Sequence, residues 1–248
     1  RYEFKNKGID VFLESLNRLN RDKDLKKKVL AFVNVPSWVG DPREDLQKRL
    51  KSKDKFTEPL QCPFITHWLH NMTHDQVLDM LKYLGMGNRP EDKVKVIFVP
   101  CYQDGHDGIL NKHYYDLILG EDLSVYPSYY EPWGYTPLES VAFRVPTITT
   151  DLAGFGLWVN SLKNQHGIND GVEVLHRSDY NYSEVADGIK DTVALFSTKT
   201  EAEIKEIRKR AGQVAEQALW KHFIQYYYEA YDIALRNACL LYTSRAHE

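Results

Sequence analysis

The sequence predicts an α/β fold: a doubly wound parallel sheet with extra C-terminal helices. Short apolar runs alternate with segments of helical periodicity, which is typical of chains that build parallel sheets. The runs contain few polar positions, as expected of strands buried on both faces. Residues 200–236 contain no proline and no glycine after Gly212, which predicts one long helix or two in series.

The elements alternate along the whole chain. Residues 9–19 carry apolar side chains at helical spacing, and residues 29–35 form an apolar run that ends at a proline. The other predicted strands are 63–66, 93–100, 121–125, 145–150 and 172–175. The other predicted helices are 41–55, 73–84, 112–119, 138–143 and 183–196. We interpret residues 1–248 as a single domain in which 200–248 is a helical extension.

The composition argues against several classes of protein. A formal net charge of −3 over 248 residues disfavours a nucleic-acid partner. No apolar run has the length of a membrane span, and no signal peptide is visible. The three cysteines form no C-x-x-C pair, which favours a reducing compartment over a disulfide framework or a zinc knuckle. We therefore expect a cytoplasmic protein with no membrane partner.

The stretch from Tyr126 to Glu139, YPSYYEPWGYTPLE, has the pattern of a functional loop. It combines prolines and a glycine, which constrain or free the backbone, with many aromatic side chains. Thr136 and Glu139 fit a capping box for the helix that follows, with Thr136 as the N-cap. A helix N-terminus after a strand is also a site for an anion. Glu131 has no capping role and is a candidate ligand for hydroxyl groups.

Ligands of open α/β sheets bind at the carboxyl ends of the strands. The loops expected there are 1–8, 100–111, 127–136 and 151–156. Basic residues in the loop 1–8 and aromatic residues in the loop 127–136 would suit a ligand that carries phosphate groups and a ring. Neither a G-x-G-x-x-G nor a Walker A pattern occurs, so a dinucleotide or ATP hydrolysis is disfavoured.

The same stretch closely resembles glycogen synthases of the fungal and animal type. VPTITT at 145–150, GFG at 154–156, RYEFKNKG at 1–8 and PEDKVKVIF at 90–98 are similar to that family as well. The resemblance extends, with gaps, to about residue 236. It implies two Rossmann-like domains, of which the chain would be the C-terminal, donor-binding one without the N-terminal, acceptor-side domain. The segment 36–63 is shorter than in that family, which suggests a bacterial member. The basic run of the C-terminal helices is reduced to Arg208-Lys209-Arg210, which argues against the family's glucose-6-phosphate control.

The resemblance also implies a reaction. The family transfers glucose from UDP-glucose to the non-reducing end of an α-1,4-glucan, with retention and without a metal or other cofactor. The implied partners are the nucleotide-sugar donor, the α-glucan acceptor, the N-terminal domain and further copies in a homo-oligomer. The chain by itself is expected to bind the donor and to transfer nothing.

Site residues carry over position by position. Arg1 and Lys7 match the cations on the diphosphate, where fixed charge stabilises the leaving UDP. Glu131 matches the carboxylate on the donor sugar, and Glu139 the one associated with the ribose. No residue matches a covalent nucleophile, so the leaving phosphate is the expected base. The remaining donor-binding residues are Trp133, Gly134, Tyr135 and Thr136, in the loop that meets the phosphate, and Tyr114, which would stack on the uracil.

Several alternatives remain open from the sequence. The chain could be a sugar-nucleotide epimerase on a similar scaffold, or a non-catalytic glucan-binding module. His67, His70 and His74 have spacings compatible with a metal but fall on different predicted elements. The preference for UDP-glucose over ADP-glucose is also open, because no residue that reads the base is identified.

Overall fold

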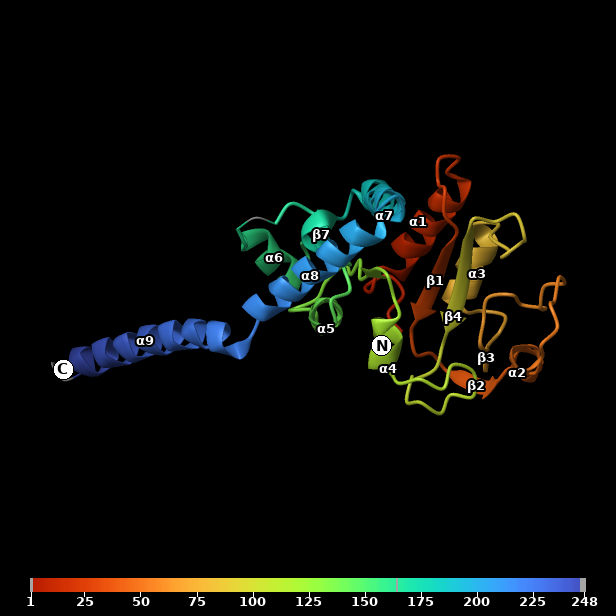
Figure 1. The fold of residues 1–248 in the computed structure, drawn as a ribbon. Coiled ribbons are helices and arrows are strands. Elements are labelled where there is room, and N and C mark those ends of the chain that lie inside the picture. Colours follow the sequence, from red (N-terminus) through yellow and green to blue (C-terminus); the bar gives the residue numbers. More distant parts are fainter. Residues whose placement is uncertain (1, 164, 246–248) are drawn as a thin grey trace.

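The computed structural model describes residues 2–163 and 165–245, in which short strands alternate with helices (Figure 1). The strands are β1 (Val29–Asn34), β2 (Val39–Pro42), β3 (His67–Leu69), β4 (Val94–Val99), β5 (Ser124–Val125), β6 (Thr147–Thr150) and β7 (Val172–Leu175). The helices are α1 (Ile9–Arg21), α2 (Glu44–Lys51), α3 (Gln76–Tyr83), α4 (Tyr114–Leu119), α5 (Tyr135–Ala142), α6 (Gly154–Ser161), the 3-10 turn η1 (Ile168–Asp170), α7 (Tyr182–Ser197), α8 (Glu201–Gln217) and α9 (Trp220–Arg245).

The predicted parallel α/β class is confirmed. β1 pairs in parallel with β4, from Val29 opposite Val94 to Asn34 opposite Val99. β5, β6 and β7 form a second parallel sheet in that order. The two sheets share no hydrogen-bonded pair among the described strands, so the single continuous sheet expected from the sequence is present as two parts. β2 and β3 form a small antiparallel pair that the sequence did not predict.

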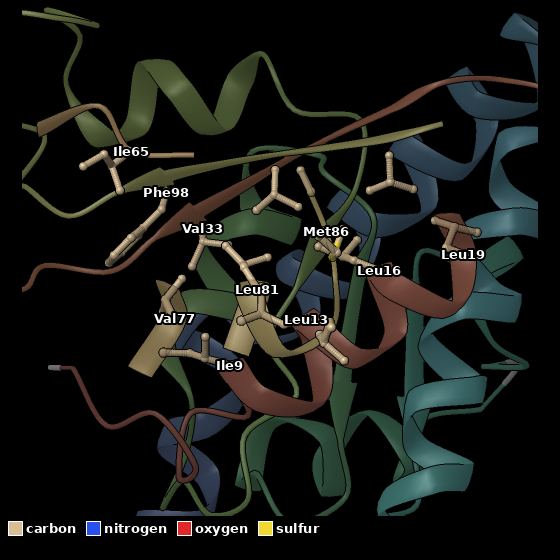
Figure 2. Close-up of a cluster of buried hydrophobic side chains, with 14 of the residues drawn as sticks. Ile9, Leu13, Leu16, Leu19, Val33, Ile65, Val77, Leu81, Met86 and Phe98 are labelled. Carbon is tan, nitrogen blue, oxygen red and sulfur yellow. The ribbon is translucent and has the colours of Figure 1, made fainter. Parts of the chain in front are cut away.

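The larger core lies where α1 and α3 cover one face of β1 and β4. Figure 2 shows this cluster, in which Leu13 and Leu16 of α1 gather with Leu81 of α3 and Val33 of β1. Burying each such side chain contributes about 1.5–3 kcal/mol to stability. On the opposite face of β1, Leu30 is 54% exposed, so this face is not covered as the sequence led us to expect.

A second core joins the part of the molecule built on β1 and β4 to the part built on β5, β6 and β7. α1 packs along α7, and the buried cluster between them includes Val11 of α1, Ile148 of β6 and Ile189 of α7. α8 begins with a capping box between Thr200 and Glu203 and packs against α5. Its apolar face is buried against β7 and α5, so α8 stabilises the sheet of β5, β6 and β7.

Several predicted boundaries were wrong. The segment predicted as a helix over 41–55 contains the end of β2 and then α2. The strand expected at 63–66 forms no ladder beyond one bridge from Ile65 to Phe98, and the strand β3 begins at His67. The reason is Arg43, which is fully buried and donates to the backbone oxygens of Gln61 and Cys62. That side chain holds the segment in a turn.

The C-terminal segment divides into two helices, one of the two arrangements predicted. α8 ends at Gln217, and α9 then projects away from the rest of the molecule (Figure 1). Most α9 side chains up to residue 238 are exposed, including Tyr227 and Tyr231. Among the helices of residues 2–163 and 165–245, none has the length and apolarity that crossing a bilayer requires.

Candidate functional site

Three loops that the sequence assigns to one crevice are joined by backbone hydrogen bonds. Tyr129 N donates to Asn6 O at 2.7 Å, which attaches the loop 127–136 to the segment 2–8. Phe155 N donates to Trp133 O at 2.7 Å, which attaches the same loop to 151–156. All three loops follow or flank the carboxyl ends of parallel strands, where α/β sheets bind their ligands.

Lys7 and Glu131 form an ion pair across two of these loops. The Lys7 ammonium donates to Glu131 Oε1, and the two side chains are 36% and 22% exposed. Lys7 is held by a turn in which its own N–H donates to Glu3 O at 2.8 Å. A partly exposed pair contributes little stability by itself. Both charges therefore remain available to a ligand that offers better partners.

The close approach of the first loop to the third depends on Gly8. Its φ of 68° lies in the left-handed region, and a Cβ there would lie 2.0 Å from Pro127 O. Glycine avoids both the backbone strain and the clash. The loop that carries Lys7 can therefore lie directly against the loop that carries Glu131.

Arg177 is a site-supporting residue that the sequence analysis missed. It is 6% exposed, donates to Pro127 O, and lies 5.5 Å over the ring of Tyr129. Burial lowers its pKa while the nearby Asp10 raises it. Burial also raises the pKa of Asp10, whose Oδ1 has no hydrogen-bond partner among the described residues. Arg177 follows the predicted strand 172–175 closely, and that position was the available signal.

Helix α5 starts two residues earlier than the predicted N-cap at Thr136 implies, and the expected capping box does not form. Its N-cap is Gly134, with φ 102° and ψ 83°, and no side chain caps the helix. The left-handed backbone at Gly134 lets the helix begin at Tyr135, which places Glu139 in the second turn rather than at N3. The N–H groups of Tyr135 and Thr136 then have no intrahelical partner, and Tyr135 is exposed. This helix start suits an anion.

Glu139 is therefore free of the capping role. Its Oε1 accepts a long hydrogen bond, 3.4 Å, from the hydroxyl of Tyr115. The Tyr115 ring in turn lies 5.2 Å from the ring of Phe143. The carboxylate is thus placed one turn into α5, next to an aromatic pair from α4 and the end of α5.

Tyr114 begins α4 and lies at the side of the crevice. Its N–H donates to Gln103 O at 3.1 Å, which ties α4 to the loop 100–111. Burial, followed by the neighbouring Tyr126, raises the pKa of Tyr114 well above its usual range. Its hydroxyl is therefore neutral at any physiological pH.

A cavity of about 970 Å³ is lined by some of these groups. Of the predicted site residues, Lys7, Tyr114 and Thr136 line it. Asn34 and Gln103 also line it, and Asn34 Oδ1 and Gln103 Nε2 are buried there with no hydrogen-bond partner among the described residues. The site end of the cavity thus offers a cation, an aromatic ring, and one unsatisfied acceptor and donor.

The predicted site residues Glu131, Trp133, Gly134, Tyr135 and Glu139 do not line this cavity. The Trp133 ring packs edge-on against Phe155 and Phe223, at 6.0 and 5.5 Å, in an aromatic cluster that also includes Trp158. That cluster joins the loop to α6 and α9 rather than lining the cavity. Arg1 lies outside the residues that the structure describes.

A group of possible metal ligands, His67, Cys101 and Asp107, lies near the loop 100–111. The His67 ring is hydrogen-bonded at both nitrogens, to Thr66 Oγ1 and to Asp107 O. Burial raises the pKa of Cys101 to about 11, which keeps the thiol protonated. The Asp107 carboxylate accepts from three backbone N–H groups that follow it in the loop. These residues fit a structural hydrogen-bond network better than a metal site. His70, which the sequence left open as a metal ligand together with His67 and His74, stacks on Trp38.

Comparison with known proteins gives a consistent result. The family-level sequence description "Glycogen synthase" matches residues 41–246. The chain is 28% identical to the glycogen [starch] synthase of Neurospora crassa, over 96% of this chain and 41% of that protein. It is 29% identical to glycogen [starch] synthase isoform 2 of Saccharomyces cerevisiae, over 95% of this chain and 42% of that protein. It is 25% identical to the liver glycogen [starch] synthase of Mus musculus, over 96% of this chain and 41% of that protein. The chain thus spans about two fifths of the length of these relatives.

Proposed function

The chain belongs to the glycogen synthase family, and from that premise we propose that it is the donor-binding part of a retaining glucosyltransferase. The proposed reaction moves glucose from UDP-glucose to the non-reducing end of an α-1,4-glucan. The observation that carries the proposal is the Lys7–Glu131 pair, held on two loops beside the free N–H groups at the start of α5.

The proposed binding step exchanges one ion pair for another. A diphosphate that enters the crevice accepts hydrogen bonds from the Lys7 ammonium and from the N–H groups of Tyr135 and Thr136. Glu131 is then released from Lys7 and accepts hydrogen bonds from hydroxyl groups of the donor sugar. Arg1 is proposed as a second cation, and Glu139 as the carboxylate near the ribose. Tyr114, with its neutral phenol, supplies a ring on which the base can stack.

The proposed chemical step needs charge stabilisation more than a protein nucleophile. The bond between C1 of glucose and the phosphate oxygen breaks, and C1 forms a bond to an acceptor hydroxyl. The leaving phosphate oxygen takes the proton of that hydroxyl, so that UDP departs as the product. Positive groups that face the leaving oxygens lower the barrier because negative charge develops there. We assign no metal or other cofactor to this step.

The proposal extends to partners and setting. The acceptor is an α-glucan, bound by a part of the protein outside this chain, and the full-length protein is a homo-oligomer in the cytoplasm. The length of the relatives supports the first point, since this chain spans about two fifths of it. Nucleic acid is not a proposed partner, because the net charge is −3.

The alternatives have less support. An epimerase needs acid and base groups placed on both sides of the sugar ring, and Glu131 is one carboxylate paired with a lysine. A glucan-binding module would use exposed aromatic rings such as Tyr227 and Tyr231 of α9. These two rings lie on α9, the helix that projects from the fold (Figure 1). The Lys7–Glu131 ion pair instead joins two loops of the crevice.

Titration calorimetry of the chain with UDP, ADP and UDP-glucose tests the proposal. We expect UDP to bind, and Lys7→Ala to weaken binding by about 10- to 100-fold, because a hydrogen bond to a charged group contributes about 1.5–3 kcal/mol. Lys82→Ala removes an exposed lysine from α3 and should leave the affinity unchanged. Binding to none of the three nucleotides would refute the proposal. Glycogen binding without nucleotide binding would favour the glucan-binding module instead.

A further inference from the structure

The side chain of Arg177 contacts two loops of the crevice at once. Its guanidinium donates a buried hydrogen bond to Pro127 O, in the loop 127–136. The same guanidinium lies next to the loop 2–8, since a Cβ on Gly8 would come within 2.8 Å of Arg177 Nη1. One buried side chain therefore lies against both sides of the crevice.

The backbone of Arg177 is anchored to the sheet of β5, β6 and β7. Arg177 follows β7, and its N–H donates to Asp151 Oδ1 at 2.9 Å. Asp151 follows β6, and its own N–H donates to Leu175 O, at the end of β7, at 3.0 Å. Because two paired strands hold this base, the long side chain extends toward the loops from a fixed point.

The ring of Tyr129 adds a second contact with the guanidinium. The guanidinium carbon of Arg177 lies 5.5 Å from the ring centroid, and a cation in this position attracts the face of the ring. The Tyr129 hydroxyl donates to Asp179, two positions after Arg177. The Tyr129 N–H donates to Asn6 O at 2.7 Å, in the loop 2–8. The segment that begins at Arg177 thus holds the residue through which the two loops meet.

The Lys7–Glu131 ion pair cannot fix the spacing of these loops during binding. The pair is partly exposed, so it contributes little stability. In the binding step proposed above, Lys7 also leaves Glu131 and turns to the diphosphate. A connection that persists in the occupied site must therefore come from other residues, and the contacts of Arg177 supply it.

We propose that Arg177 is a positioning residue of the donor site, which fixes the spacing of Lys7 and Glu131 through its contacts with Pro127 and Tyr129. It acts through the two loops and touches neither the diphosphate nor the sugar. Loops that hold the binding geometry for only a fraction of the time reduce the apparent affinity by that fraction. The consequence for binding rests on the proposed function, whereas the effect on the loops can be measured without nucleotide.

Amide hydrogen exchange without nucleotide measures the effect on the loops. Arg177→Met removes the donor to Pro127 O and keeps an apolar side chain in the space. We expect the Tyr129 amide to exchange about 10-fold faster or more, because the contact between the loops opens more often. The amide of Phe155 donates to the other end of the same loop, and that of Thr147 lies in the sheet. Both should keep the rates of the parent chain.

Arg43→Met is the matched control. Arg43 is also buried, donates to backbone oxygens and lies 4.7 Å from the ring centroid of Trp68. Its backbone acceptors belong to residues 61–65 rather than to the crevice loops. This variant should lose overall stability without a selective effect at Tyr129. Arg177→Lys keeps one donor for Pro127 O and should restore part of the protection that Arg177→Met loses.

A titration with UDP measures the consequence for the site. Arg177→Met should weaken binding by about 10-fold, Arg177→Lys by less, and Arg43→Met not at all. Saturating UDP should also restore the protection of the Tyr129 amide in Arg177→Met, because a ligand that contacts both loops favours their closed arrangement. If the parent chain binds no UDP, the proposed function fails, and the exchange rates alone decide whether Arg177 positions the loops.

Three results would overturn the proposal. The first is an unchanged exchange rate at Tyr129 in Arg177→Met. The second is an equal acceleration at Tyr129, Phe155 and Thr147, which is the result of a loss of overall stability alone. The third is full UDP affinity in a variant whose Tyr129 amide exchanges faster, which would mean that the loop contact does not affect the site. If Arg177→Met does not fold, the same three results are sought in Arg177→Lys, where a smaller acceleration confined to Tyr129 supports the proposal.

Discussion

Glu121 is a half-buried carboxyl group at the edge of the cavity between β1 and β5. Burial raises its pKa to about 7, and the hydroxyl of Ser124, at 3.2 Å from Oε2, opposes this shift only in part. A carboxyl group whose pKa is higher in the folded protein binds more protons there than in the unfolded chain. The free energy of unfolding therefore falls as the pH rises from about 4.5 to about 7, and stays low above that window.

Glu121→Gln should remove this dependence. We expect the variant to be more stable than the parent chain at pH 8, by up to about 3 kcal/mol, and similar to it near pH 4. Urea denaturation at several pH values measures the difference. Asp122→Asn, which changes the exposed neighbouring carboxylate, should leave the slope unchanged. A parent stability that does not fall between pH 4.5 and 7 would contradict the assignment.

At the residue scale, the sequence singled out the charged side chains of the crevice but not the buried residues that hold their loops in place. Lys7 and Glu131 are 124 positions apart, yet the residues of both loops predicted one crevice. Arg177 was missed because its role depends on burial against Pro127 and Asp10, and burial of an arginine leaves no local pattern. The capping box was wrong because Gly134 offers a left-handed start that competes with Thr136.

At the element scale, the loop 2–8 depends on one backbone conformation. Gly8→Ala would introduce a left-handed strain of about 1–2 kcal/mol and also a Cβ 2.0 Å from Pro127 O. We expect it to destabilise the protein by about 2 kcal/mol more than strain alone and to weaken nucleotide binding. Urea denaturation and a UDP titration measure the two effects.

Gly85→Ala is the matched control for that change. Gly85 follows α3 with φ 69°, almost the same as Gly8, but a Cβ there meets nothing within 4 Å. The control should lose only the stability that the backbone strain costs, about 1–2 kcal/mol, and should retain the affinity for UDP. Equal losses of unfolding free energy and of UDP affinity in the two variants would show that the contact between residue 8 and Pro127 does not matter.

Most regular elements were predictable, and the exceptions have local causes. The predicted 93–100 strand and 9–19 helix were found because their patterns are long and unbroken. α6 was read as a loop because its first turn contains two glycines, Gly154 and Gly156. Both are needed for close packing, since a Cβ would lie 2.3 Å from Pro132 O and 2.1 Å from Thr150 O respectively. Tertiary contact therefore overrides the low helix propensity of glycine.

At the scale of the whole molecule, the two sheets hold the two sides of the site. Lys7 precedes α1, which packs on the sheet of β1 and β4, whereas Glu131 and α5 belong to the sheet of β5, β6 and β7. The sequence could predict parallel strands but not their division, because hydrophobic runs carry no information about which edges pair. The contacts of α1 with α7 and the Lys7–Glu131 pair connect the two sides.

An amide chemical-shift titration of the 248-residue chain with UDP is the decisive test of nucleotide binding between the two loops. We expect the largest shifts at Lys7 and Gly8 on one side of the crevice and at Gly134, Tyr135 and Thr136 on the other, with smaller shifts near Tyr114. The shifts on the two sides should saturate with the same dissociation constant. Shifts confined to other parts of the molecule, or a change on one side alone, would contradict it.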